Sequence, residues 1–281
     1  MTDSTSDLPD RILSSYDITL VPVDIRFGRK VYKDRIELSP TKFYSLLSYS
    51  EYLPITTPPT PVYIYKKIKE KLTESPKVLF ITLSKALSRT YHNALIAKDF
   101  LPKSKVEVLD SSMLTIGTGL IAIYAGMLRD AGYSLHQVIR KLEKIKKRAT
   151  AMMQPENLTF LERSGRVENA IQLFLGKTLK AQPVLGLEND EVYPLASVFS
   201  YKKGIEKMIE IAKSKYAGEP ILVGVVDSGA VSWADVLESR IREELAPVEI
   251  IRSTLGPSVG THIGPNSIGV AIIPFEELET Q

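Results

Sequence analysis

Hydroxyl side chains and one histidine gather in four short runs that lie far apart in the sequence. The runs are residues 3–9 (DSTSDLP), 56–61 (TTPPTP), 87–91 (LSRTY) and 260–265 (GTHIGP). A buried carboxylate needs hydrogen-bond donors of this kind, because desolvating an unpaired charge costs several kcal/mol. The residue types therefore favour holding an anion over breaking a bond.

The chain has no cysteine and three histidines. Disulfides, thiolate metal sites and cysteine nucleophiles are therefore excluded, and a histidine-rich metal site is disfavoured. We expect a function without a metal or a cofactor.

The four runs resemble the motifs of the DegV family, and the resemblance extends from Thr2 to about Phe275. Members of that family bind a long-chain fatty acid. The resemblance implies that Thr56 of a TSQPS-like turn and Ser88 of an LSGTY-like run hold the carboxylate, with His262 of a GAHTGPG-like loop close by. It implies no catalytic residue, and the bound fatty acid would be the ligand.

An acyl chain needs an apolar slot, because each buried methylene contributes roughly 0.8 kcal/mol. By the family's pattern this slot lies between two domains. The second half of the chain offers the following apolar residues to line it: Ile171, Phe174, Leu175, Leu179 and Val184.

The resemblance also implies a partner, namely a separate ATP-dependent fatty acid kinase to which the acyl chain is presented. Two departures leave that partner open. The family's SSGLSGTY run is SKALSRTY at residues 84–91, which replaces both glycines and adds charge near the pocket. An R-T-R-K-like run is FSYK at residues 199–202, although Arg163 and Arg166 remain.

A third departure lies at the start, where the family carries a short apolar strand and only Met1 precedes Thr2 here. Either the first strand is missing or the start codon has been placed too late. A missing strand would leave backbone groups of the sheet to be satisfied in another way. The sequence leaves both alternatives open.

Serine and threonine are also common helix caps and turn residues, so Ser88 and Thr56 taken singly would more often have a structural role. Residues 3–9 can likewise be an Asx turn that opens a helix. His92 and His136 fall on predicted helices, whereas we expect His262 in a loop between two strands. The coincidence with family motifs favours binding for Thr56, Ser88 and His262.

Three patterns in the sequence are typical of enzymes. Residues 256–260 (GPSVG) fit the G-x-S-x-G elbow, but we expect no helix after them, and His262 follows with no acidic residue between, contrary to the hydrolase order. Residues 117–122 (GTGLIA) mimic a dinucleotide fingerprint inside an apolar run, where close packing of a helix explains the glycines better. The glycines of residues 256–264 can direct N–H groups at an anion, but the P-loop lysine is absent.

Ser88 beside His262 would still form a nucleophile and a base. The alternative function is therefore a serine-dependent acyl-transfer or hydrolytic enzyme that acts on a lipid or an acyl phosphate.

Apolar runs alternate with amphipathic stretches, which is typical of an α/β architecture. We predict strands at residues 18–23, 78–83, 106–109, 149–153, 182–187, 191–198, 221–227, 248–251 and 267–273. We predict helices at residues 61–72, 90–100, 112–131, 135–147, 202–216 and 233–245. The prediction is a Rossmann-like α/β domain over residues 1–148 and a second α/β domain with a mixed sheet over residues 149–281, with the ligand between them.

Composition adds few constraints. The 281 residues are 44% apolar and 25% charged with a net charge of +3, as in an ordinary soluble protein without a nucleic-acid partner. The basic residues 140–148 are typical of a solvated helix face. No run approaches the roughly 20 apolar residues of a membrane span, and the first residues do not resemble a signal peptide, so we expect a cytoplasmic protein.

Overall fold

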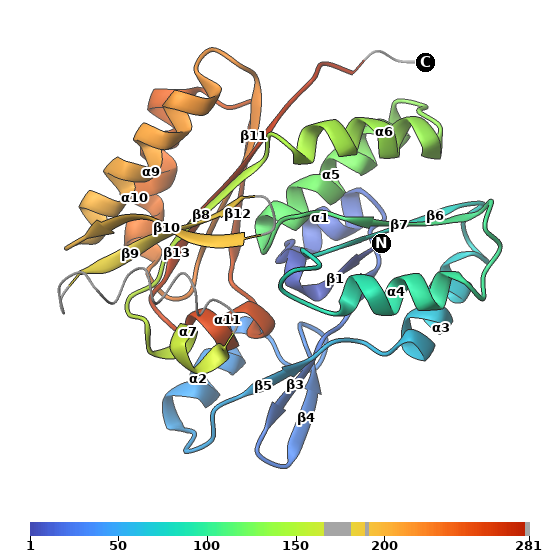
Figure 1. Ribbon diagram of the computed structural model, residues 1–281, viewed down its shortest axis with the longest axis horizontal. Helices are drawn as coiled ribbons and strands as arrows, with labels where there is room; N and C mark the ends of the chain where they lie inside the picture. Colours follow the sequence, from blue (N-terminus) through green and yellow to red (C-terminus); the bar gives the residue numbers. More distant parts are fainter. Residues whose placement is uncertain (166–180, 189–190, 279–281) are drawn as a thin grey trace.

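The computed structural model describes residues 1–165, 181–188 and 191–278, which form one small sheet and two larger sheets joined by helices (Figure 1). One of the larger sheets is parallel and the other is mixed, and helices pack against both. The predicted α/β class, with a Rossmann-like first sheet and a mixed second sheet, is confirmed. Within the described residues, no helix is long and apolar enough to span a membrane.

The parallel sheet has the strand order β2-β1-β6-β7, from β1 (Thr2–Asp3), β2 (Leu20–Val21), β6 (Val78–Thr82) and β7 (Val106–Asp110). Helices α3 (Pro61–Lys71) and α4 (Thr90–Lys98) bury apolar side chains against Val78, Phe80 and Val106 of this sheet. The predicted strands and helices of this region are confirmed, with β2 shorter than expected.

The first strand is present but only two residues long. Thr2 pairs with Leu20 on one side and with Ile81 on the other, so β1 occupies the middle of the sheet. The amino group of Met1 donates a hydrogen bond to the Leu79 carbonyl oxygen at 2.9 Å, and the Ile81 N–H donates to the Met1 carbonyl oxygen at 3.0 Å. Burial, with a smaller effect of the Lys71 charge, lowers the pKa of this amino group to about 5.

The second sheet has the order β10-β9-β8-β13-β11-β12, and among its described strands only β11 and β12 run parallel to each other. Its strands are β8 (Thr150–Gln154), β9 (Gln182–Glu188), β10 (Glu191–Val198), β11 (Ile221–Asp227), β12 (Glu249–Thr254) and β13 (Ile268–Pro274). Helices α9 (Tyr201–Tyr216) and α10 (Val231–Leu245) cover its outer face, seen on the left of Figure 1. The predicted strands and helices agree with these within a few residues.

Helix α5 (Ile116–Asp130) lies between the two sheets and is followed by α6 (Leu135–Lys146). The glycines of α5 permit this close packing: a Cβ on Gly119 would lie 2.7 Å from the Ser6 carbonyl oxygen, and one on Gly117 would lie 3.3 Å from Ala271 Cβ. The interpretation of residues 117–122 as packing glycines is confirmed. Helix α5 begins four residues later than predicted.

A small third sheet was not predicted. It consists of β3 (Asp24–Phe27), β4 (Lys30–Lys33) and β5 (Ile55–Thr57) in the order β4-β3-β5, and helix α2 (Pro40–Tyr49) packs on its inner face. Its strands have at most four residues and carry charged side chains on the outer face, so they show no apolar run. The positive φ of Gly28, 55°, marks the hairpin turn.

Four short helical segments complete the described fold, namely a 3₁₀ turn (Ser4–Ser6), α1 (Asp10–Ser15), α7 (Thr159–Ser164) and α11 (Pro257–Ile263). The Thr5 N–H donates to Asp3 Oδ1 at 3.0 Å, so the predicted Asx turn is confirmed. The predicted loop around His262 is wrong: Pro257 occupies the first turn of α11, where its missing N–H is tolerated.

The division at residue 148 remains a prediction. Described strands before it belong to the parallel and the small sheet, and those after it belong to the mixed sheet. One apolar core, however, joins α5 to both halves.

Candidate functional site

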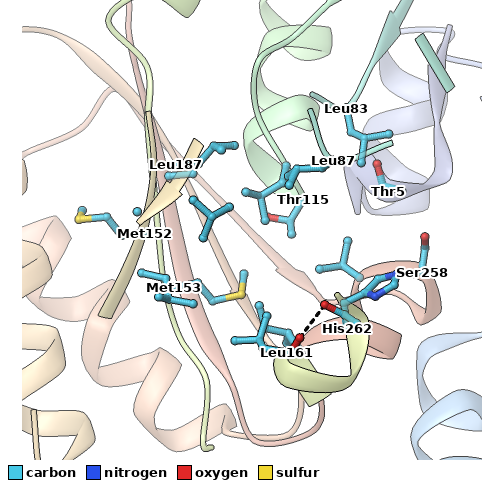
Figure 2. A pocket seen from close by; sticks show the side chains of 18 of the residues that line it. Thr5, Leu83, Leu87, Thr115, Met152, Met153, Leu161, Leu187, Ser258 and His262 are labelled. Carbon is cyan, nitrogen blue, oxygen red and sulfur yellow. Dashed lines mark hydrogen bonds between the residues drawn. The ribbon is translucent and has the colours of Figure 1, made fainter. Parts of the chain in front are cut away.

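An apolar cavity of about 100 Å³ lies between the two halves of the chain. Figure 2 shows Leu83 and Leu87 on its upper side and Met152, Met153 and Leu187 on its left. Strands β8 and β9 and the loops after β6 and β7 thus supply an apolar lining from both halves.

The predicted tail residue Val184 does not line this cavity. It is fully buried on the other face of β9, in the core formed with α9 and α10. Its neighbours Leu185 and Leu187 line the cavity instead, because successive side chains of a strand point to opposite faces. The other predicted tail residues, Ile171, Phe174, Leu175 and Leu179, lie outside the described residues, as does Arg166.

Polar groups gather at one side of the cavity. Figure 2 shows Thr5, Ser258 and His262 on the right, away from the methionines of β8. Thr5 comes from the 3₁₀ turn, whereas Ser258 and His262 lie one turn apart on α11. The site therefore has a polar end and an apolar end. Thr5 and Ser258 were not predicted as site residues, although both lie in motifs that the sequence analysis describes.

The structure brings Thr56 and His262 together. Thr56 Oγ1 lies 3.0 Å from His262 Nε2, although the two residues are 206 positions apart. Thr56 is placed by β5, where it pairs with Ile25 of β3, and His262 is placed by α11.

A second, more polar hollow adjoins the apolar cavity. It is lined by Thr56, Arg163, Thr261 and other residues, and it shares His262 and Ser164 with the cavity. We call this hollow the vestibule. The exposed Arg163 supplies a positive charge there that can attract an anion.

Ser88 lies in the loop between β6 and α4. Its Oγ accepts a hydrogen bond from the Thr90 N–H at 3.2 Å and lies 3.0 Å from Thr90 Oγ1, which is a local turn one residue before the N-cap, Arg89. Ser88 itself lines neither the cavity nor the vestibule. The preceding residue, Leu87, lines the cavity. The Asn93 side chain donates to the Pro59 carbonyl oxygen at 2.9 Å, which holds the turn after β5 against α4.

The serine elbow requires a correction. Helix α11 does follow β12, so residues 256–260 follow a strand and begin a helix, contrary to our expectation. Ser258 nevertheless is not among the residues of positive φ, so it lacks the strained turn of a nucleophile elbow. Nowhere in the described residues do three or more acidic, histidine or cysteine side chains form a group that could hold a metal ion.

The sequence matches the family described as "Uncharacterised protein, DegV family" over residues 1–275. It is 31% identical over 280 residues to a DegV domain-containing protein of Caldanaerobacter subterraneus, with 99% of this chain and 98% of that protein covered.

Solved structures resemble the fold over nearly its whole length. A fatty-acid-binding DegV family protein of Thermus thermophilus superposes with a TM-score of 0.91 at 27% identity, and DegV of Bacillus subtilis, described as a fatty acid binding protein, with 0.88 at 26%. Each comparison covers 98% of both chains.

Proposed function

Because the chain belongs to the DegV family, we propose that it binds a long-chain fatty acid in the cavity between its two halves. The observation that carries the proposal is the division of that cavity into an apolar part and a polar end beside the vestibule. A fatty acid likewise consists of an apolar chain and a polar head group. The descriptions of the Thermus thermophilus and Bacillus subtilis relatives support the choice of ligand.

In this proposal Thr56, Ser88 and His262 hold the carboxylate. His262 lines both hollows, Thr56 lines the vestibule, and Ser88 lines neither but follows the cavity residue Leu87. The Thr56 hydroxyl and the His262 imidazole are already within hydrogen-bond distance of each other, so they can turn jointly to one carboxylate oxygen. Ser88 lies two residues before the first residue of α4, near the helix end where backbone N–H groups favour negative charge. Arg163 adds positive charge from the vestibule.

The acyl chain occupies the apolar part. At about 10–15 Å³ for each water-sized group, the cavity has room for roughly seven to ten methylenes. Their burial contributes roughly 6–8 kcal/mol at about 0.8 kcal/mol each. Met152 and Met153 are unbranched and can change conformation to admit a longer chain.

The test is a titration with a labelled fatty acid. The double variant Thr56→Ala, Ser88→Ala should bind at least about tenfold more weakly, since two hydrogen bonds to a charged group are lost. Thr60→Ala is the matched control: Thr60 caps α3 in the same segment as Thr56 but does not line the vestibule as Thr56 does, so affinity should be unchanged. Equal affinity of the double variant and the wild type would refute the assignment of the head group.

In this proposal the protein carries its ligand and does not itself catalyse a reaction. The vestibule would present the carboxylate to a separate enzyme, such as an ATP-dependent fatty acid kinase. A cytoplasmic location is part of the same proposal.

One observation supports an acyl-transfer enzyme as a second candidate, because Ser258 and His262 lie one turn apart and both line the cavity. Incubation with a long-chain aryl ester and with an acyl phosphate separates the two functions. Product release that disappears in Ser258→Ala or Ser88→Ala would favour the enzyme, and the absence of turnover would favour the carrier.

A further inference from the structure

The N-terminal end of α11 lies on two buried carboxylates from the other half of the chain. Asp7 Oδ1 accepts a hydrogen bond from the Gly256 N–H at 2.9 Å, and the Asp7 carbonyl oxygen accepts one from the Ser253 hydroxyl. Asp7 has no exposed surface. The connection between β12 and α11 is therefore held from residues about 250 positions away in the sequence.

Asp34 is the second carboxylate, and it is also fully buried. Its Oδ2 accepts a hydrogen bond from the Ser4 hydroxyl at 2.8 Å. Burial raises the pKa of Asp34, and the Ser258 N–H near the start of α11 is among the groups that oppose this shift. A Cβ on Gly256 would lie 2.6 Å from Asp7 Oδ1 and 3.7 Å from Asp34 Oδ1. Both carboxylates thus converge on Gly256, the residue that precedes the first residue of the helix.

Arg35 fixes this arrangement. Its Nη1 lies 3.6 Å from Asp7 Oδ1, and its Nη2 donates to the Leu8 carbonyl oxygen at 2.8 Å. Asp7 and Arg35 both have positive φ, 51° and 62°, which costs roughly 1–2 kcal/mol for each residue. Burying a carboxylate also costs free energy, and well-packed apolar side chains at these positions would make the folded state at least as stable. This combination points to a role other than stability.

The position of α11 decides the position of the polar end of the cavity. The helix has only seven residues, and it carries Ser258 near its start and His262 near its end. Its middle offers little freedom, because a Cβ on Gly260 would lie 2.5 Å from Tyr44 Oη and 2.8 Å from Phe43 Cε1. A helix this short moves as one unit, so a shift of its first turn would move the His262 imidazole relative to Thr56.

We propose that Asp7 and Asp34 are positioning residues, which hold the start of α11 so that His262 faces Thr56 and the polar end of the cavity. The consequence for ligand affinity depends on the proposed function, whereas the effect on His262 does not. The positioning can therefore be measured in the protein without a ligand.

The experiment is nitrogen NMR of the histidine rings. The chain has three histidines, so His262→Gln identifies the signals of His262. Thr56→Val records the ring shifts that accompany loss of the 3.0 Å contact. We expect Asp7→Ala to move the His262 signals in the direction of Thr56→Val and to weaken fatty-acid binding about tenfold. Asp7→Asn keeps an oxygen acceptor for Gly256 and should restore both properties.

Asp227→Ala is the matched control. Asp227 is nearly as buried and accepts the Gly229 N–H at 2.9 Å, but its other side-chain partner is Arg252, 2.7 Å away. This variant should lose stability and leave the His262 signals in place. If Asp7→Ala does not fold, two other variants disturb the packing of the two carboxyl groups against Gly256. Asp34→Ala removes the second carboxyl group, and Gly256→Ala adds a Cβ that would clash with Asp7 Oδ1.

The outcomes separate the two proposals. Unmoved His262 signals in folded Asp7→Ala, or in the two further variants, would overturn the positioning role. Moved signals with unchanged fatty-acid affinity would support the positioning and refute the proposed head-group site. Failure of Asp7→Asn to restore the signals would also overturn the role, because the hydrogen-bond acceptor would then not be what matters.

Discussion

The buried carboxyl of Asp34 makes the stability of the protein depend on pH. Burial, opposed by the Ser4 hydroxyl and by Arg35, raises the pKa of Asp34 from 3.8 to about 7. The native state therefore keeps this proton to a higher pH than the unfolded state does. Between about pH 4 and pH 7 the native state binds more protons, so stability falls as pH rises.

The size of the effect follows from the shift. About three pKa units correspond to roughly 4 kcal/mol over the whole window, of which roughly 2–3 kcal/mol falls between pH 5 and pH 8. Asp34→Asn has nearly the same shape, cannot ionise, and keeps an oxygen for the Ser4 hydroxyl. The variant should therefore lose less stability than the wild type as pH rises.

Urea unfolding at pH 5 and pH 8 measures the difference. Asp3 and Asp7, whose pKa values burial also raises, are present in both proteins. The Asp34 charge adds to the raised pKa of Asp7, so Asp34→Asn removes this smaller effect as well. We expect the stability of Asp34→Asn relative to the wild type to increase by roughly 2–3 kcal/mol from pH 5 to pH 8. Parallel pH profiles of the two proteins would refute the reasoning.

Two further substitutions distinguish residues that bind the ligand from residues that only stabilise the fold. Leu187→Trp should fill the apolar cavity, abolish fatty-acid binding and lower stability by about 1–3 kcal/mol. Chemical denaturation and a ligand titration measure the two effects, and retained affinity would place the acyl chain elsewhere. Ser134→Ala removes a capping box at the start of α6 and should lower stability by about 1 kcal/mol without changing affinity, so a loss of affinity would contradict the assigned role.

Much of the fold could be predicted because its strands are buried on both faces. Residues 221–226 form a continuous run without a polar side chain, and the predicted strand, residues 221–227, agrees with β11 in both bounds. The small sheet could not be found in this way, because its strands have at most four residues and two of them, β3 and β4, carry charged residues such as Arg26 and Lys33. Helix α11 has seven residues with glycine, proline and serine among them, so periodicity does not reveal it.

The candidate site could be predicted only in part. The contact between Thr56 and His262 joins distant segments, and the family resemblance pointed to it before the fold was known. Val184 was placed on the wrong face because an apolar strand buried on both sides does not show which face meets a cavity. Thr5 and Ser258 lay in motifs whose roles were ambiguous between a turn and a binding site.

The most direct test is to identify what the purified protein carries. Native mass spectrometry of the intact protein, together with solvent extraction and mass analysis of the extract, measures the ligand and its stoichiometry. We predict one long-chain fatty acid for each chain, or uptake of one when it is added to delipidated protein. A protein that is empty and takes up no added fatty acid would contradict the account.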